Sequence, residues 1–320
     1  MSDAAAPREV APGVILVDTG YVRPGLAAAW IVKGKTSVAV IETGTAHSVP
    51  NILAGLAAHG IGRGDVSHVI VTHVHLDHAA GAGALLAQLP HARLVVHPRG
   101  ARHMIDPSKL LAGAAEVFGG MDAIRMLYGD VLPAPAGRVI EAPEGALVEL
   151  GDRPLRILDA PGHARHHFVV HDPATQGFFT GDTFGISYRE FDTAAGPFLF
   201  PTTTPVQFDP PALRASVERM LAEKPERMYL THYGMLEGEI PKRAAAFLEA
   251  VDGHVRVARA AAPGKGRKAA IQAGLAEQLV DGLARHGWKG TRDEAVAAFA
   301  VDFDLNSQGL EVWLDARSGA

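Results

Sequence analysis

The stretch THVHLDHAAG, residues 72–81, is the most informative part of this chain. It follows the apolar residues 69–71, a run that is typical of a buried strand. Side chains alternate along an extended chain, so His73 and His75 are expected to point to the same side. Crowded imidazoles repel one another when protonated, whereas a divalent metal accepts neutral imidazole nitrogens together with a carboxylate. The stretch therefore predicts a metal site at a strand end, with His73, His75, Asp77 and His78 as potential ligands.

Three further potential ligands stand later in the chain, each directly behind an apolar run that we interpret as a strand. They are His163 after residues 155–158, Asp182 after residues 177–180 and His232 after residues 228–230. A lone histidine or aspartate at a strand end is more often a cap or a surface group. Three in series, each behind a strand, favour a shared metal site instead.

The motifs HVHLDH, PGH, TGD and TH together resemble the signature of the metallo-β-lactamase superfamily, and among its members the glyoxalase II-like hydrolases, which carry HxHxDH. The resemblance covers roughly residues 12–235. It implies an α/β fold, a four-layer αββα sandwich, with two metals at one edge of the sheets. By motif position it implies that His73, His75 and His163 hold the first metal. Asp77, His78 and His232 would hold the second, with Asp182 as the bridge.

The resemblance also implies an activity. Two adjacent divalent cations lower the pKa of a shared water and supply hydroxide near neutral pH. We expect a hydrolase of small activated acyl substrates, such as thioesters, lactones or other esters. Asp77 is the candidate catalytic residue, orienting the nucleophile while it binds metal; the alternative is that it is a ligand only. Zn is the expected metal, with Fe or Mn as alternatives.

Other readings of the same ligands stay open. Relatives of this fold use iron for persulfide dioxygenase or diiron oxygen chemistry, and ligand type alone does not separate Zn from Fe. A processing nuclease also uses HxHxDH, but 30 basic against 35 acidic residues, a formal charge of -5, weigh against a nucleic-acid partner. The last alternative is a metal-binding sensor without turnover.

The composition narrows the remaining classes. The 320 residues contain no cysteine, which excludes disulfides, thiolate ligands and a cysteine nucleophile. The start, MSDAAAPREVAPG, lacks a basic segment followed by an apolar run, so we expect no secretory signal. No apolar run approaches the roughly 18 residues of a membrane span. The expected location is the cytoplasm.

Strand-like runs and helices alternate up to about residue 240, with single helices predicted at 49–59, 79–89 and 210–223 and irregular helices at 101–130. From there the pattern is helical, at 242–261, 268–286 and 292–300. We therefore predict a catalytic domain over residues 1–240 and a C-terminal helical region over 241–320. These helices are expected to shape the pocket or to form a homodimer interface, and residues 263–268 to be a solvated linker.

The loop of residues 185–208 follows Asp182 and is expected to form a pocket wall for a small-molecule substrate. Its candidate substrate-binding residues are Tyr188, Arg189, Phe198 and Phe200, with Arg189 as the reader of an anionic group. Three residues beside the ligands could support them or donate protons, but a structural role is expected for each: His166, His167 and Tyr233. Two other histidines, His171 and His254, are expected at the surface.

Overall fold

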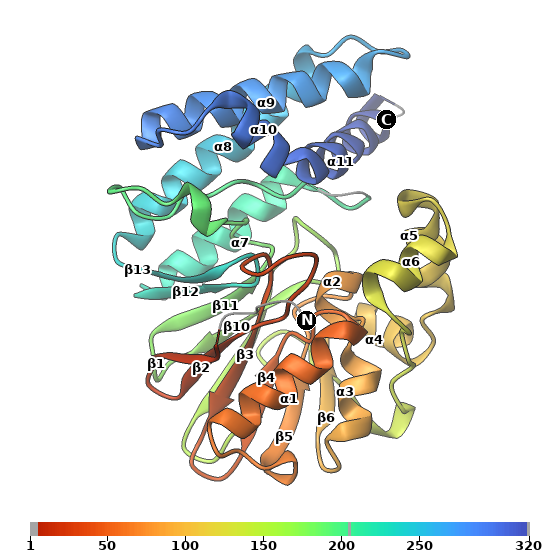
Figure 1. Ribbon diagram of the computed structural model, residues 1–320, viewed down its shortest axis with the longest axis vertical. Helices are drawn as coiled ribbons and strands as arrows, with labels where there is room; N and C mark the ends of the chain where they lie inside the picture. Colours follow the sequence, from red (N-terminus) through yellow and green to blue (C-terminus); the bar gives the residue numbers. More distant parts are fainter. Residues whose placement is uncertain (1–5, 204–205, 319–320) are drawn as a thin grey trace. The chain divides into compact units, whose positions relative to one another are not determined.

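The computed structural model describes residues 6–203 and 206–318 (Figure 1). Two compact units emerge, and each is discontinuous in sequence. The first runs over Met1–Asp159, His166–Gly181 and Pro225–Glu237, and the second over Ala160–Arg165, Asp182–Lys224 and Gly238–Ala320. This division differs from a single boundary at residue 240, because two earlier segments group with the C-terminal helices. The predicted loop 185–208 belongs to the second unit, and its residues 204–205 lie outside the described ranges.

The first unit contains two sheets. The strands of the first sheet are β1 (Arg8–Ala11), β2 (Val14–Asp18), β3 (Ala28–Lys33), β4 (Val38–Ile41), β5 (Val66–Ile70), β6 (Arg93–Val96) and β7 (Val139–Glu141), and they neighbour one another in this order. Pairing is antiparallel from β1 to β4 and parallel from β4 to β7. Residues 34–37 connect β3 to β4.

The second sheet has the order β13-β12-β11-β10-β9-β8. Its strands are β8 (Leu147–Glu149), β9 (Pro154–Asp159), β10 (Phe168–Asp172), β11 (Gly177–Gly181), β12 (Arg227–Leu230) and β13 (Gly234–Glu237). Only β11 and β12 pair in parallel; the other pairs are antiparallel. The edge strands β1 and β13 were not anticipated from the sequence, because neither forms a continuous apolar run.

Alternation along the strands builds two cores. In β2, Ile15 and Val17 join the core formed with helices α1 (Val49–Ala58) and α3 (Ala82–Gln88), whereas Val14 and Leu16 face the second sheet. Between the sheets, the buried Trp30 meets Phe179 and Tyr229 edge-on, at ring distances of 5.8 and 5.2 Å. A sheet buried on both faces explains why these strands are apolar without interruption.

The single helix predicted over residues 79–89 is wrong at one point. The chain forms α2 (Leu76–Ala79) and α3, separated around Gly81. A Cβ on Gly81 would come within 2.6 and 2.7 Å of the carbonyl oxygens of Thr45 and Thr43. The close approach of two backbones therefore requires glycine here, and it interrupts the helix directly after the HxHxDH stretch. The irregular insertion was correct: α4 (Pro98–Ile105), α5 (Ser108–Phe118) and α6 (Met121–Tyr128) occupy it.

The second unit is helical. Its helices are α7 (Pro210–Ala222), α8 (Ile240–Ala260), α9 (Arg267–His286), α10 (Arg292–Ala298) and α11 (Ala300–Ser318), of which α11 was not predicted. The predicted linker ends early, because Arg267 begins α9 and binds Asp315 through two hydrogen bonds of 2.8 Å. This pair and a third bond to Glu311 fasten α9 to α11. Among the described helices, none is long and apolar enough to cross a membrane.

Two histidines expected at the surface are buried, so that prediction was wrong. His171 is 8% exposed and stacks on Phe178 at 4.5 Å. His254 is fully buried in α8, where its Nδ1 lies 3.1 Å from the carbonyl oxygen of Ala250 and 3.2 Å from Oε1 of Gln278. Both histidines lie on the inward face of their element, a position that their polarity hides from a sequence pattern.

The burial of His254 predicts a pH-dependent stability. Burial lowers the pKa of this ring from 6.5 to about 4, so the unfolded chain takes up a proton before the folded chain does. The stability that depends on the neutral ring is complete above pH 6.5 and is lost as the pH falls toward 4. His254→Asn keeps an amide near the Ala250 carbonyl but does not titrate. From pH 7 to pH 5 the free energy of unfolding should fall by about 2 kcal/mol less in His254→Asn than in the parent protein. Urea denaturation at each pH measures the difference.

His91→Asn, at an exposed position, is the control and should retain the parental pH slope. An unchanged slope in His254→Asn would contradict the assignment.

Candidate metal centre

The predicted ligands of the HxHxDH stretch converge at the end of β5. The chain leaves the strand after Ile70, and His75 caps α2 in an extended conformation. His73 Nε2 lies 3.0 Å from His75 Nδ1, and the rings of His73 and His78 are 4.1 Å apart. His73 and His78 are completely buried. Imidazole nitrogens held this closely suit a cation better than they suit one another.

His232, which follows β12, joins this group from a distant part of the sequence. Its Nε2 lies 3.2 Å from Asp77 Oδ2, and His78 Nε2 lies 3.6 Å from the same oxygen. Asp77, His78 and His232 each offer a ligand atom, all within 4.8 Å of one another. His232 Nδ1 lies 2.9 Å from the carbonyl oxygen of Leu26, which can only accept a hydrogen bond. Nδ1 therefore carries the proton, and Nε2 keeps a lone pair for a metal.

In the second unit, His163 and Asp182 lie side by side. His163 Nε2 is 3.4 Å from Asp182 Oδ2. Thr202 Oγ1 lies 3.0 Å from His163 Nδ1 and donates to the Asp182 carbonyl oxygen at 3.4 Å, so Nδ1–H donates to the hydroxyl. This leaves the lone pair of His163 on Nε2, beside the carboxylate. Thr202 was missed by the sequence reasoning because a threonine twenty residues past Asp182 carries no motif.

Two glycines set the positions of these ligands. Gly162 has φ +132, and a Cβ there would come within 2.3 Å of the Leu213 backbone at α7. Gly181 has φ +48, and a Cβ there would meet Thr72 Oγ1 at 2.4 Å and His167 Nε2 at 2.5 Å. Only glycine fits both the backbone angle and the space at these positions. The glycines of PGH and TGD are therefore explained by packing.

Glu42 supports the cluster and was not found from the sequence. It follows β4, is 1% exposed and has a positive φ of 66. One carboxylate oxygen accepts hydrogen bonds from the backbone and the hydroxyl of Thr72, and the other lies 3.4 Å from His78 Nδ1. The carboxylate thus holds the residue before His73 and the far nitrogen of His78. Such partners orient metal ligands and raise their basicity.

Glu42→Gln is expected to weaken metal binding about 10- to 100-fold while the protein stays folded, because the amide keeps the shape but loses the charge behind His78. Competition with a chromophoric chelator measures the affinity. Glu149→Gln, an exposed carboxylate on β8, is the matched control and should leave the affinity unchanged. An equal affinity in Glu42→Gln would show that the carboxylate only fills space.

Comparison with known proteins gives a family match over the segment that contains these motifs. The family description of the metallo-beta-lactamase superfamily matches residues 22–232, more than half of the chain and inclusive of every predicted metal ligand. The chain belongs to the metallo-β-lactamase superfamily. A solved structure of an archaeal superfamily protein from Sulfolobus tokodaii covers 93% of the chain, with a TM-score of 0.65 and 22% identity, and the chain covers 98% of it. The fold class predicted from the sequence is thereby confirmed.

Two curated relatives of this superfamily protein are hydrolases by name. A hydroxyacylglutathione hydrolase of Cupriavidus taiwanensis is 31% identical over 251 residues, 76% of this chain and 71% of the relative. An acyl-coenzyme A thioesterase of Gallus gallus is 29% identical over 193 residues, 55% of this chain and 65% of the relative, slightly under two thirds of its length. The family and these relatives identify the chain as a metal-dependent hydrolase.

The residues beside the ligands in this superfamily protein have structural contacts. The His167 ring stacks on His73 at 4.7 Å, and Tyr233 donates to Asp18 at 3.4 Å. The His166 ring lies 5.7 Å from that of His75. Burial, with a contribution from His75, lowers the pKa of His166 to about 3, so this ring is neutral at physiological pH.

The four predicted substrate residues occupy different environments in the second unit. Tyr188 is buried and donates to the carboxylate of Asp302 at 3.1 Å. Arg189 binds the carbonyl and hydroxyl of Ser187 and lies 3.4 Å from Asp192. Phe198 and Phe200 line a cavity. Their roles toward a substrate stay predictions.

Proposed function

We propose that this chain hydrolyses small activated acyl compounds, thioesters foremost, at a dinuclear metal centre. The observation that carries the proposal is the convergence of Asp77, His78 and His232, with ligand atoms within 4.8 Å, beside the paired rings of His73 and His75. Imidazole and carboxylate donors are the ligands of catalytic zinc and of related divalent ions. Zn is the first expectation, with Fe and Mn as alternatives.

His163 and Asp182 complete the proposed seven-ligand set. Asp182 follows Gly181, whose backbone lies against Thr72, the neighbour of His73. His163 is three residues from His166, whose ring lies near His75. The positions of the PGH and TGD motifs support Asp182 as the bridge and His163 as the third ligand of the first metal.

Two divalent cations bound there would lower the pKa of a shared water and polarise the acyl carbonyl. The side chains of the protein supply the rest. The carboxylate oxygen Oδ2 of Asp77 lies between His78 and His232. In this position it can orient the attacking water as well as bind metal. Glu42 and the Leu26 carbonyl keep the rings of His78 and His232 from rotating. Preset donors of this kind avoid reorganisation during the reaction.

The choice of thioesters follows the relatives and the composition. One relative is named as an acyl-coenzyme A thioesterase and another as a hydroxyacylglutathione hydrolase, so we propose thioesters as the first substrate class of this chain. A chain with a formal charge of -5 is poorly suited to a polyanionic nucleic acid. Lactones and other activated esters share the electrophilic carbonyl and remain in the proposed class.

The test is a hydrolysis screen of acyl-coenzyme A, acyl-glutathione and lactone substrates, combined with elemental analysis. We expect two metal ions per chain, thioester hydrolysis that a chelator abolishes, and recovery when metal is restored. A reproducible content of one ion would refute the dinuclear centre. Absence of acyl hydrolysis, together with oxygen consumption by the iron-loaded protein, would refute the hydrolase proposal in favour of redox chemistry.

A further inference from the structure

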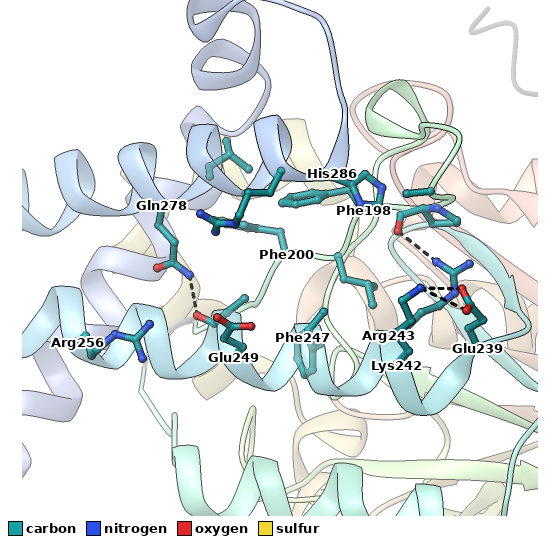
Figure 2. Close-up of a pocket in the computed structure, with 18 residues that line it drawn as sticks. Phe198, Phe200, Glu239, Lys242, Arg243, Phe247, Glu249, Arg256, Gln278 and His286 are labelled. Atoms are coloured by element: carbon teal, nitrogen blue, oxygen red, sulfur yellow. Dashed lines mark hydrogen bonds and ion pairs between the residues drawn. The ribbon is translucent and has the colours of Figure 1, made fainter.

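The second unit contains a cavity of about 330 Å³ between α8, α9 and residues 195–200 (Figure 2). Every lining residue belongs to this unit, and none is one of the seven proposed metal ligands. A cavity of this size is at the lower end of the range that holds small organic ligands.

The cavity has a rigid aromatic surface. Phe198, Phe200 and Phe247 all line it. Phe247 is 1% exposed and stacks on Phe184 at 5.6 Å, and Phe200 is 2% exposed. The tip of Phe198 lies 3.2 Å from the place that a Cβ on Gly282 would occupy, so glycine lets the ring pack closely against α9. Phe198 is partly exposed and can offer ring surface to a ligand, whereas Phe200 and Phe247 are nearly completely buried and hold the wall in place.

The polar lining carries an excess of positive charge. Its four cations are Lys242, Arg243, Arg256 and Arg285, and its two carboxylates are Glu239 and Glu249. The formal sum is 4 minus 2, or +2, within a chain whose total is -5. A cavity of opposite sign to its protein attracts anions rather than cations.

Two of these cations have protein partners. Arg243 donates to the carbonyl oxygen of Gly238 at 3.1 Å. It also donates to that of Pro197 at 3.4 Å, and Lys242 lies 3.3 Å from Glu239 (Figure 2). Within the described part of the chain, Arg256 and Arg285 make neither an ion pair nor a side-chain hydrogen bond. A guanidinium group presents several donors in a planar fork that matches a carboxylate or a phosphate.

We propose that this cavity binds a small amphipathic anion. The apolar body of the ligand lies against Phe198 and Ala246, and its carboxylate or phosphate head is held by the guanidinium group of Arg256 or Arg285. This binding function goes beyond acyl hydrolysis and uses residues outside the proposed metal centre.

Isothermal titration calorimetry tests the ligand class with decanoate, decyl phosphate, decanol and butyrate. We expect one of the two long-chain anions to bind at least about tenfold more tightly than decanol, which lacks the charge, and than butyrate, which lacks the apolar body. The tighter of the two anions identifies the head group. Binding of both anions no tighter than that of decanol would overturn the proposal.

A pair of α8 variants locates the binding. Ala246 and Ala245 are both exposed on this helix, but only Ala246 lines the cavity. Ala246→Phe fills the space and should abolish binding, whereas Ala245→Phe should retain it. Parental affinity in Ala246→Phe would overturn the assignment. The proposal would also be overturned if neither anion binds the parent protein and sedimentation shows that Ala246→Phe changes the oligomeric state.

A charge comparison tests the head-group contact. The double variant Arg256→Gln/Arg285→Gln should lower the affinity for the preferred anion at least about tenfold and leave the affinity for decanol unchanged. The double variant Lys265→Gln/Lys289→Gln, on two exposed lysines outside the cavity, removes the same two charges and is the control for net charge. If the control weakens anion binding as much as the arginine double variant does, the effect comes from net charge alone and the proposed head-group contact is overturned. All titrations are repeated with chelator-treated protein, so the result does not depend on hydrolysis.

Discussion

Asp182→Ala is expected to lower the metal content at both proposed positions and to reduce kcat/KM by about three orders of magnitude. A bridging carboxylate neutralises charge between two cations that otherwise repel each other. The substitution also removes the partner 3.4 Å from His163 Nε2. Elemental analysis and thioester kinetics on the same preparations measure the two effects.

Asp281→Ala, on an exposed position of α9, is the control for loss of one negative charge. It should keep both the metal content and the rate. Retention of two metals and a near-parental rate in Asp182→Ala would refute the bridge. Loss of one metal with the other at full occupancy would assign Asp182 to a single ion.

Asp172→Ala is expected to lower the free energy of unfolding by about 3–5 kcal/mol. Asp172 is completely buried and accepts two hydrogen bonds from Arg153, at 3.0 and 2.5 Å. Arg153 also donates to the carbonyl oxygens of Pro12 and Lys33, at 3.0 Å each, so the pair joins β10 to the turns of the first sheet. Arg153 is only 6% exposed, so without the aspartate its buried guanidinium group would have no counter-charge. Urea denaturation measures the loss.

Asp252→Ala is the matched control, because it breaks the ion pair with Arg214 at 2.9 Å, where both side chains are exposed. That loss should stay below about 1 kcal/mol. The double variant Arg153→Met/Asp172→Leu should recover most of the stability lost in Asp172→Ala. Equal, small losses at the buried and the exposed pair would contradict the argument from burial.

Most candidate ligands of the proposed metal centre could be named from the sequence because their signals are local. His73, His75, Asp77 and His78 lie within one short stretch, and the others end apolar strands, so pattern and spacing identify them. The supports of these ligands could not be found in the same way. Glu42 stands thirty residues before Thr72, and Thr202 far beyond His163, and both act through contacts that only folding creates.

The fold, too, was predictable only in part from the sequence. Apolar runs predicted the inner strands, because a buried strand is continuous in sequence. The edge strands β1 and β13 carry no such run, and the break at Gly81 depends on carbonyl oxygens from a loop more than thirty residues away. The buried His254 shows the same limit, since polarity alone placed it at the surface.

By itself, the sequence determined the superfamily, the identity of the candidate ligands and the α/β class, because these follow from residue type and short spacing. Only the tertiary structure decided which nitrogen of His163 and His232 carries the proton, where Glu42 acts, and that α8 and α9 line a positively charged cavity with aromatic side chains. Each of these depends on the distance between side chains that are remote along the chain, and that distance is a property of packing rather than of any segment.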